Sequence, residues 1–459
     1  MAAISDPGVT WRLRSGGDDT NGGGYLELGG ADYSDQDAAR ESRTDWATAD
    51  GTTTTITSAV GGLSSDLVGN VLRISAGSNF APGYYLINSV PDANSLVLDR
   101  APATDIGSGG VGKIGGSFSD YRIALSGNAA ITSPLANGHR VLFRGSGTDS
   151  PTNADFVFST FGTFATSGVL AQAAEPVEIG SYNGRALLER SSGTLVIHNN
   201  RNCRIHGLSF RSTGITHAVN GMVSGIGNAQ IADCVFDANG FDVAGVNAVN
   251  SVTGCRFINS GGSPGALRAA IAGTHVAACG NRIEGWPGLG IKTTGIAALS
   301  NNLITGCGGA GIEMRPNSNN FSSAFYNTIV DCPVGVLLPI DGLSNATLID
   351  NLISDCATAI EAQYNDGTVD VAEAILRAMS ISRNAFHANG TNYSVAVSPP
   401  GDIQLSAIPY VDPGSGNYAL NDVAGGGGEL RAAGGANAYG ATQSFRDIGA
   451  IQSQASGGG

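Results

Sequence analysis

The sequence predicts an all-β protein: a right-handed parallel β-helix solenoid with a small N-terminal β module and an irregular C-terminal cap. The first observation is an aliphatic or aromatic anchor that recurs at Phe210, Phe236, Phe257, Ile283, Ile304, Ile329, Ile353 and Phe386. The spacings lie between 21 residues (Phe236 to Phe257) and 26 (Phe210 to Phe236), apart from a last gap of 33. Such a period, built from β-type phrases, is typical of stacked strands.

The second observation is the phrase around each anchor. Several anchors close the same phrase, as in Asn302-Leu303-Ile304, Asn327-Thr328-Ile329 and Asn351-Leu352-Ile353. A small residue and a β-branched residue then follow at near-fixed distance, at Gly290-Ile291, Gly311-Ile312, Gly335-Val336 and Ala359-Ile360. This pattern predicts a bend and a second strand in each coil, with another side chain facing inward.

The composition supports this fold class and excludes others. The chain has 459 residues, of which 68 are glycine and only 14% are charged, which disfavours a helical bundle and a disordered chain. The net charge of −14, without any Lys/Arg cluster, argues against nucleic-acid binding. The sequence shows neither a signal peptide at its N-terminus nor an apolar stretch of about 18 residues, so we expect no membrane insertion.

Three zones follow from the pattern along the chain. Residues 1–118 form the N-terminal module, in which Val71–Ile74, Tyr84–Ile87 and Leu96–Leu98 are separated by turn residues and predict a β hairpin core. A short helix is expected between residues 34 and 48. Residues 119–398 form the parallel β-helix, with a helical insertion at residues 371–378. Residues 399–459 break the period and form the C-terminal cap and a loose tail.

Cysteine and asparagine recur at fixed places in the coils. The seven cysteines all lie inside the repeat zone, roughly one per coil, and the sequence has no Cys-x-x-Cys pair. This recurrence predicts buried, reduced thiols in ladders rather than disulfides or a zinc site. Five asparagines stand two residues before an anchor, at Asn281, Asn302, Asn327, Asn351 and Asn384. We expect each amide to bond to the equivalent amide one coil away.

These coils resemble those of pectate-lyase-like β-helix proteins, clearly over residues 200–398 and more weakly over 119–200. The ends of the chain resemble β-helix proteins of tailed bacteriophages. The phrases that carry this resemblance are Ser15–Gly24, Ala76–Tyr85 with Leu96–Arg100, Asp412–Leu420 and Asp447–Ala450.

The phage resemblance implies a virion protein that is assembled in the host cytoplasm. It would be a structural tailspike or head-decoration protein that serves particle architecture or host-surface adhesion. Its expected partners are other virion proteins and host-surface polysaccharide, and a homotrimer is implied. No cofactor is expected. Because such spikes often cleave glycosidic bonds, the alternative is a polysaccharide depolymerase, either a glycoside hydrolase or a lyase.

Paired carboxylates are the first requirement of that alternative chemistry. Glycosidases hold two carboxyl groups about 5–5.5 Å apart if retaining and about 6.5–9.5 Å apart if inverting. Asp331 and Asp355 lie two residues after successive anchors, so we expect them to stack one strand spacing apart, about 4.8 Å. Glu313 and Glu361 share one column with a coil between them. Chance also produces such pairs in a solenoid, and Lys292 precedes Glu313 in its column, which favours a surface ion pair.

Two aromatic residues are candidates for a carbohydrate platform. Trp286 takes a turn position held elsewhere by Cys or Asn, and Tyr364 follows Glu361 by three residues. Trp286 fits a turn filler at least as well. The Asp18–Asp19 phrase occurs once and reads as a turn, and the six histidines lack metal-ligand spacing, so no metal site is predicted.

Overall fold

The structure is a computed structural model of the full chain. It describes residues 4, 8–119, 138–145, 177–190, 195–197, 203–212, 222–225, 229–247, 249–261, 268–315, 321–340, 345–364, 379–431, 433 and 447–450. The chain divides into two compact units, the first mainly residues 1–188 and the second mainly residues 210–459. Parallel stacked solenoid coils occupy the chain between residues 178 and 363, as the sequence predicts.

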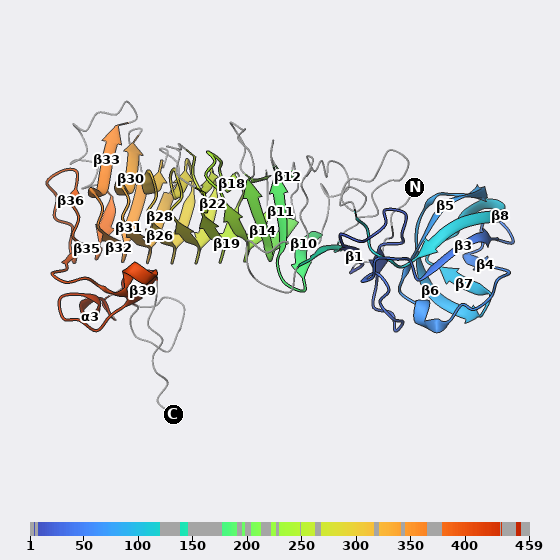
Figure 1. Ribbon diagram of the computed structural model, residues 1–459. Helices are drawn as coiled ribbons and strands as arrows, with labels where there is room; N and C mark the ends of the chain where they lie inside the picture. The colour runs from blue at the N-terminus through green and yellow to red at the C-terminus, as the bar shows by residue number, and fades with distance from the viewer. Residues whose placement is uncertain are drawn as a thin grey trace. The chain divides into compact units, whose positions relative to one another are not determined.

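The first unit contains a six-stranded antiparallel sheet in the order β3-β8-β5-β6-β7-β4 (Figure 1). Its elements are β3 (Glu41–Trp46), β4 (Thr55–Thr57), the 3-10 turn η1 (Ser65–Leu67), β5 (Val71–Phe80), β6 (Gly83–Asp92), β7 (Ser95–Leu98) and β8 (Ala103–Ile114). One apolar cluster that includes Trp46, Leu72 and Ile87 fills it. The hairpin strands match the sequence prediction. The predicted helix is wrong, because residues 41–46 pair with β8 and bury Arg43 and Trp46.

A second sheet of this unit begins at the very start of the chain. The strands are β1 (Thr10–Leu13), β2 (Gly24–Tyr25), β9 (Arg140–Arg144), β10 (Val177–Tyr182) and β13 (Cys203–His206). β1 pairs in parallel with β9, which pairs with β10. Trp11 anchors β1: its ring stacks on Phe118 at 6.1 Å and its Nε1 donates to His139 Nδ1 at 3.1 Å. Residues 10–13 therefore pair with residues that follow 130 positions later in the sequence.

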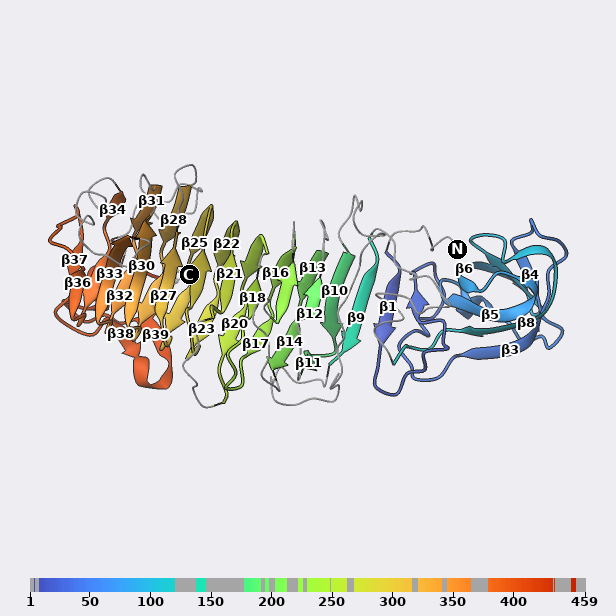
Figure 2. The same ribbon diagram turned by 90° about the horizontal axis from the view of Figure 1, so that it is seen from above.

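The second unit consists of three parallel sheets through which each coil passes in turn (Figure 2). The first sheet contains β16 (Gln230–Ala232), β19 (Ser251–Thr253), β22 (Val276–Cys279), β25 (Ala297–Ser300), β28 (Phe321–Phe325), β31 (Asn345–Ile349) and β34 (Ser380–Ser382). The second contains β17 (Val235–Asp237), β20 (Arg256–Ile258), β23 (Arg282–Glu284), β26 (Leu303–Thr305), β29 (Thr328–Val330), β32 (Leu352–Ser354), β35 (Ala385–His387) and β37 (Ile403–Gln404). The third contains β15 (Val223–Gly225), β18 (Val246–Asn247), β21 (Ile271–Gly273), β24 (Ile291–Thr293), β27 (Ala310–Met314), β30 (Val334–Ile340), β33 (Thr358–Tyr364) and β36 (Thr391–Tyr393). Residues of both units occur in β11 (Ala186–Arg190), β12 (Leu195–Ile197) and β14 (Leu208–Ser212).

The repeat of the sequence sets the register of these sheets. The anchors from Phe236 to Phe386 stand in one column of the second sheet and are buried. The phenyl rings of Phe210, Phe236 and Phe257 stack with centroids 4.9 and 4.8 Å apart. The predicted second strand is the third sheet, where Ile291, Ile312, Val336 and Ile360 align.

Two columns of left-handed residues make the turns between sheets. Between the first and second sheets φ is positive at Asp233, Gly254, Gly280, Asn301, Tyr326, Asp350 and Arg383. Between the second and third sheets it is positive at Asn239, Gly285, Gly306, Asp331, Asp355 and Ala388. Gly, Asn and Asp tolerate this conformation best, which explains their recurrence at these places.

The predicted asparagine ladder follows the first turn column. Each Nδ2 donates to the Oδ1 of the next asparagine at 2.9–3.0 Å, from Asn281 through to Asn384. Each backbone N–H donates to the same oxygen at 3.0–3.1 Å. The run ends when Asn384 N donates to Asp402 Oδ1 at 2.9 Å. Because every side-chain amide of the ladder has the same orientation, Asp402 at its end needs only to accept a hydrogen bond.

The cysteines are reduced, as predicted, for the six whose side chains are described. Cys307, Cys332 and Cys356 follow the second turn column, and the Cys332 thiol contacts Cys307. Burial raises the pKa of the Cys356 thiol to about 12, so it stays protonated and unreactive at neutral pH. These buried thiols fill the turns.

The C-terminal segment covers the side of the second sheet. β37 pairs with β35, so it adds a strand at that edge of the sheet. The later elements are β38 (Tyr410–Asp412), η3 (Pro413–Ser415), β39 (Asn417–Leu420) and the short helix α3 (Gly427–Leu430). Their apolar residues join one buried cluster with the outward side chains Val330, Leu352 and Ala385. The predicted helical insertion at 371–378 and the tail at 456–459 lie outside the described residues.

Candidate functional site

Asp331 and Asp355 are the first residues after β29 and β32, in the second turn column. Both have left-handed backbones, with φ of 53° and 56°. Val330 pairs with Ser354, and Asp331 N donates to Ser354 O at 3.1 Å, so the two aspartates stand on successive coils. Their backbones are therefore one strand spacing apart, about 4.8 Å. This is the stacking that the repeat predicts.

The C-terminal segment brings further polar groups to this pair. Burial raises the pKa of the Tyr418 phenol, the nearby Asp331 carboxylate raises it further, and Arg282 opposes them. Arg282 also donates from Nη2 to Gly416 O at 3.0 Å, which fastens the segment to β23. Tyr410 forms a hydroxyl contact of 2.9 Å with Ser354. A tyrosine hydroxyl and an arginine thus lie near two carboxylates.

The backbone spacing of this pair permits the carboxyl separation of a retaining glycosidase, but the pair lacks the burial of one. Asp331 is exposed, and the Asp355 side chain is 47% exposed with His387 Nδ1 at 4.0 Å. A general acid usually sits in a desolvated pocket, which shifts its proton affinity into the working range. Both aspartates also fit the turn for a purely conformational reason, since Asp tolerates positive φ.

Glu313 and Glu361 lie in one column of the third sheet, as predicted. Glu313 pairs with Leu337, and Leu337 pairs with Glu361, so two strand spacings, about 9.6 Å, separate their backbones. Glu313 is buried and contacts Lys292 Nζ at 3.2 Å and Arg315 Nε at 2.6 Å. Glu361 accepts a hydrogen bond from Gln363. The two cations give Glu313 a structural ion-pair role.

The two candidate aromatic residues differ in what the structure shows. Trp286 is fully buried, meets Phe257 edge to face at 6.0 Å, and donates from Nε1 to Arg268 O at 3.1 Å. The ring therefore fills a turn and leaves no free face for a sugar. Tyr364 ends β33 opposite Ile340, and its side chain lies outside the described part of the chain.

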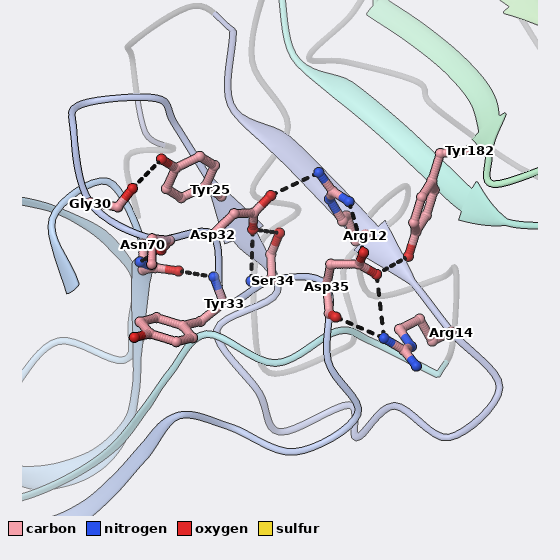
Figure 3. Close-up of polar contacts among 11 residues, drawn as sticks. Arg12, Arg14, Tyr25, Gly30, Asp32, Tyr33, Ser34, Asp35, Asn70 and Tyr182 are labelled. Atoms are coloured by element: carbon pink, nitrogen blue, oxygen red, sulfur yellow. Dashed lines mark hydrogen bonds and ion pairs between the residues drawn. The ribbon is translucent and has the colours of Figure 1, made fainter. Parts of the chain in front are cut away.

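A polar cluster of the first unit joins residues 32–37 to β1 and β10 (Figure 3). Arg12 contacts Asp32 at 2.7 Å and Asp35 at 3.3 Å, and Arg14 contacts Asp35 at 3.4 Å. Tyr182 donates to Asp35 Oδ1 at 2.7 Å, while the Arg12 guanidinium lies 4.8 Å from its ring centre. Arg14 Nε also contacts Asp37 Oδ1 at 2.8 Å, so every charged group of the cluster has a partner of opposite sign, and its geometry fits a clamp between chain segments.

Within the described ranges, no group of three or more His, Cys, Asp and Glu side chains has the geometry to hold a metal ion. Asp18, in the Gly-rich phrase near the N-terminus, instead contacts Lys113 at 2.8 Å, and this ion pair lowers the pKa of its carboxyl to about 2. In the part of the chain that is described, no helix is long and apolar enough to span a bilayer.

Sequence reasoning missed the groups that surround Asp331, of which one comes from the C-terminal segment and one from β23. Tyr418 belongs to a phrase that the sequence marks only as a closing segment, and Arg282 belongs to a strand 136 residues earlier. Nothing in the repeat links them, because the segment lies outside the period. Comparison with known proteins adds no assignment: no family model matches this sequence, and no curated protein is significantly similar to it.

Proposed function

We propose that this chain is a structural β-helical component of a tailed-phage particle, a spike or decoration protein that serves architecture or adhesion to the host surface. The phrases at both ends of the chain suggest the phage, and one structural observation supports a scaffold role. The asparagine ladder runs unbroken from Asn281 to Asp402 and satisfies the buried turn of every coil it crosses. A stack of this kind is a rigid rod with internally paired polar groups.

Mass spectrometry of gradient-purified particles tests the location. The chain should co-sediment with particles of the phage that encodes it and remain bound after a high-salt wash. Its absence from intact particles, with abundance in the lysate, would contradict the proposal. Virion assembly in the host cytoplasm and contact with other virion proteins are part of the same proposal.

The proposed assembly is a homotrimer, since closed cyclic symmetry suits a spike. Light scattering on the purified protein should give three times the chain mass of 46.3 kDa. A monomer mass that persists at micromolar concentration would contradict the trimer. That result would leave the proposed location in the virion unaffected.

A polysaccharide depolymerase remains the second candidate, favoured by one observation. The backbones of Asp331 and Asp355 stack about 4.8 Å apart beside Tyr418, which permits the separation of about 5–5.5 Å between carboxyl groups in retaining enzymes. Incubation with host polysaccharide separates the two candidates. Release of oligosaccharides that disappears in Asp331→Asn or Asp355→Asn, but survives in the matched turn variant Asp233→Asn, would establish the enzyme.

A further inference from the structure

A groove of about 290 Å³ opens at the last coil, beside the edge strands β36 and β37. Polar groups line one side: the Asp402 carboxylate, the Tyr393 hydroxyl and the amides of Asn392 and Gln404. Val397 and Pro399 contribute to an apolar wall. Small-molecule sites are usually about 300–1,000 Å³, with mostly apolar walls and a few oriented polar groups. This groove is at the small end of that class.

Asp402 differs from other carboxylates that this unit buries. Asp237 is held by Arg211 at 3.1 Å, Glu313 by Arg315 at 2.6 Å, and Asp350 by Arg383 at 2.9 Å. Asp402 instead accepts hydrogen bonds from the Tyr393 hydroxyl and Asn384 N. Over the described residues, no arginine or lysine nitrogen comes within 4.0 Å of it. A half-buried carboxylate without a cation is costly, because neutral donors offset only part of its desolvation.

The groove offers acceptors and ring faces rather than donors. A carboxylate has about four lone-pair sites, and the Tyr393 hydroxyl, Asn384 N and the Asn384 side chain leave about one of them for a ligand. Asn392 Nδ2 donates to Gln404 Oε1 at 2.6 Å, so one amide N–H is already used within the wall of the groove. The amide oxygens of the two residues still have lone pairs that can accept a hydrogen bond. Gln404 Nε2 donates to Phe386 O at 3.2 Å. The ring of Phe386 meets that of Tyr393 edge to face at 5.4 Å, so aromatic surface adjoins the carboxylate.

We propose that this groove binds an alkylammonium group, with the ammonium on Asp402 and the alkyl stem against Val397 and Pro399. An ammonium supplies three donors and no acceptor, which complements an acceptor-rich wall. It also supplies the missing positive charge, and aromatic rings attract cations. Burial raises the pKa of the Asp402 carboxyl, which is the direction expected for a carboxylate without a positively charged neighbour among the described residues. An anionic ligand is disfavoured by the same carboxylate.

Saturation-transfer NMR on the full-length protein tests this site with three probes: n-butylammonium, n-butanol and glucose. The amine should bind with a dissociation constant of about 1 mM, as expected of a small ligand in an open groove. Butanol should bind at least about tenfold more weakly, since it keeps the chain length and loses the charge. Glucose tests the rival reading of the groove as a sugar site.

Asp402→Asn is the decisive variant because it removes the charge and keeps the Oδ1 acceptor for Asn384 N. It should weaken amine binding at least about tenfold, the loss of roughly 1.4 kcal/mol. Asp422→Asn, at a carboxylate 89% exposed and outside the groove, should bind as the unaltered protein does. Thermal unfolding verifies that both variants fold. If Asp402→Asn fails to fold, Tyr393→Phe serves as the second groove variant.

Three results would overturn the proposal. They are equal binding of butanol and amine, unchanged amine binding in the folded groove variants, and a glucose signal without an amine signal. None of them bears on the virion location, which particle analysis tests separately.

Discussion

Replacing Asn327 with alanine tests whether the amide ladder holds the coils together. The Asn327 side chain accepts from Asn302 N at 3.1 Å and from Asn302 Nδ2 at 2.9 Å. It donates to Leu299 O at 3.0 Å and to Asn351 Oδ1 at 2.9 Å. Asn327 is fully buried, so water does not replace these partners.

The expected cost follows from the groups that lose their partners. Alanine leaves Asn302 N–H and Leu299 C=O short of a hydrogen bond inside the turn. Each such buried group costs about 1–3 kcal/mol, so the local loss is about 4 kcal/mol. Because a repeat array opens in segments, this loss lowers the free energy of opening of the surrounding coils more than that of distant ones.

Hydrogen exchange read by mass spectrometry is the suitable assay. A loss of about 4 kcal/mol predicts exchange about a thousandfold faster in peptides around Asn302. Thr294→Ala is the matched control, because its hydroxyl is exposed and, among the described residues, bonds only to Thr274, at 3.4 Å. That control should change stability by less than about 0.5 kcal/mol. An exchange rate in Asn327→Ala within about threefold of that in the unaltered protein would refute the reasoning. It would mean that the ladder contributes little to the stability of the coils.

Three further predictions concern other groups. The Asp18 pKa falls from 3.8 to about 2 beside Lys113, so its contribution to stability is present above pH 3.8 and lost as the pH falls through about 2. Melting temperatures of Asp18→Asn and the unaltered protein should converge at pH 2, and a gap that widens there would contradict the ion pair. Glu313→Gln should lower the free energy of unfolding by about 1–3 kcal/mol, because Lys292 loses its buried partner; a stability equal to that of the unaltered protein would sink this reading. Cys332 should not react with a thiol reagent until urea unfolds the chain, because the hydrogen bond with Cys307 and then burial raise its pKa, and burial also blocks access; fast labelling of the native protein would count against the buried ladder.

Much of the solenoid was predictable because its repeat is local. The anchor column from Phe236 to Phe386, the third-sheet column at Ile291 and the asparagine ladder all follow from positions counted along the sequence. The stacking of Asp331 on Asp355 follows from the same count. Each coil repeats one geometry, so equal spacing in sequence becomes vertical alignment in space.

The expected helix near residues 34–48 failed because pairing overrode local propensity. The strand Glu41–Trp46 pairs with β8 at the edge of the sheet and buries Trp46. Helix propensity summed over neighbouring residues does not include either of these tertiary contributions. The surroundings of Asp331 were equally hidden. They depend on Tyr418 and Gly416, which reach the second sheet only after the chain has left the repeat.

The sequence by itself determined the fold class, the coil register and which side chains stack, because these depend on contacts between neighbouring repeats. The tertiary structure alone decided three things: that Thr10–Leu13 pairs with β9, that the C-terminal segment packs on the side of the second sheet, and that Asp402 lies in a groove without a cation. These depend on contacts between segments far apart in sequence and outside the period. No local pattern encodes such contacts, since only the folded chain brings their surfaces together.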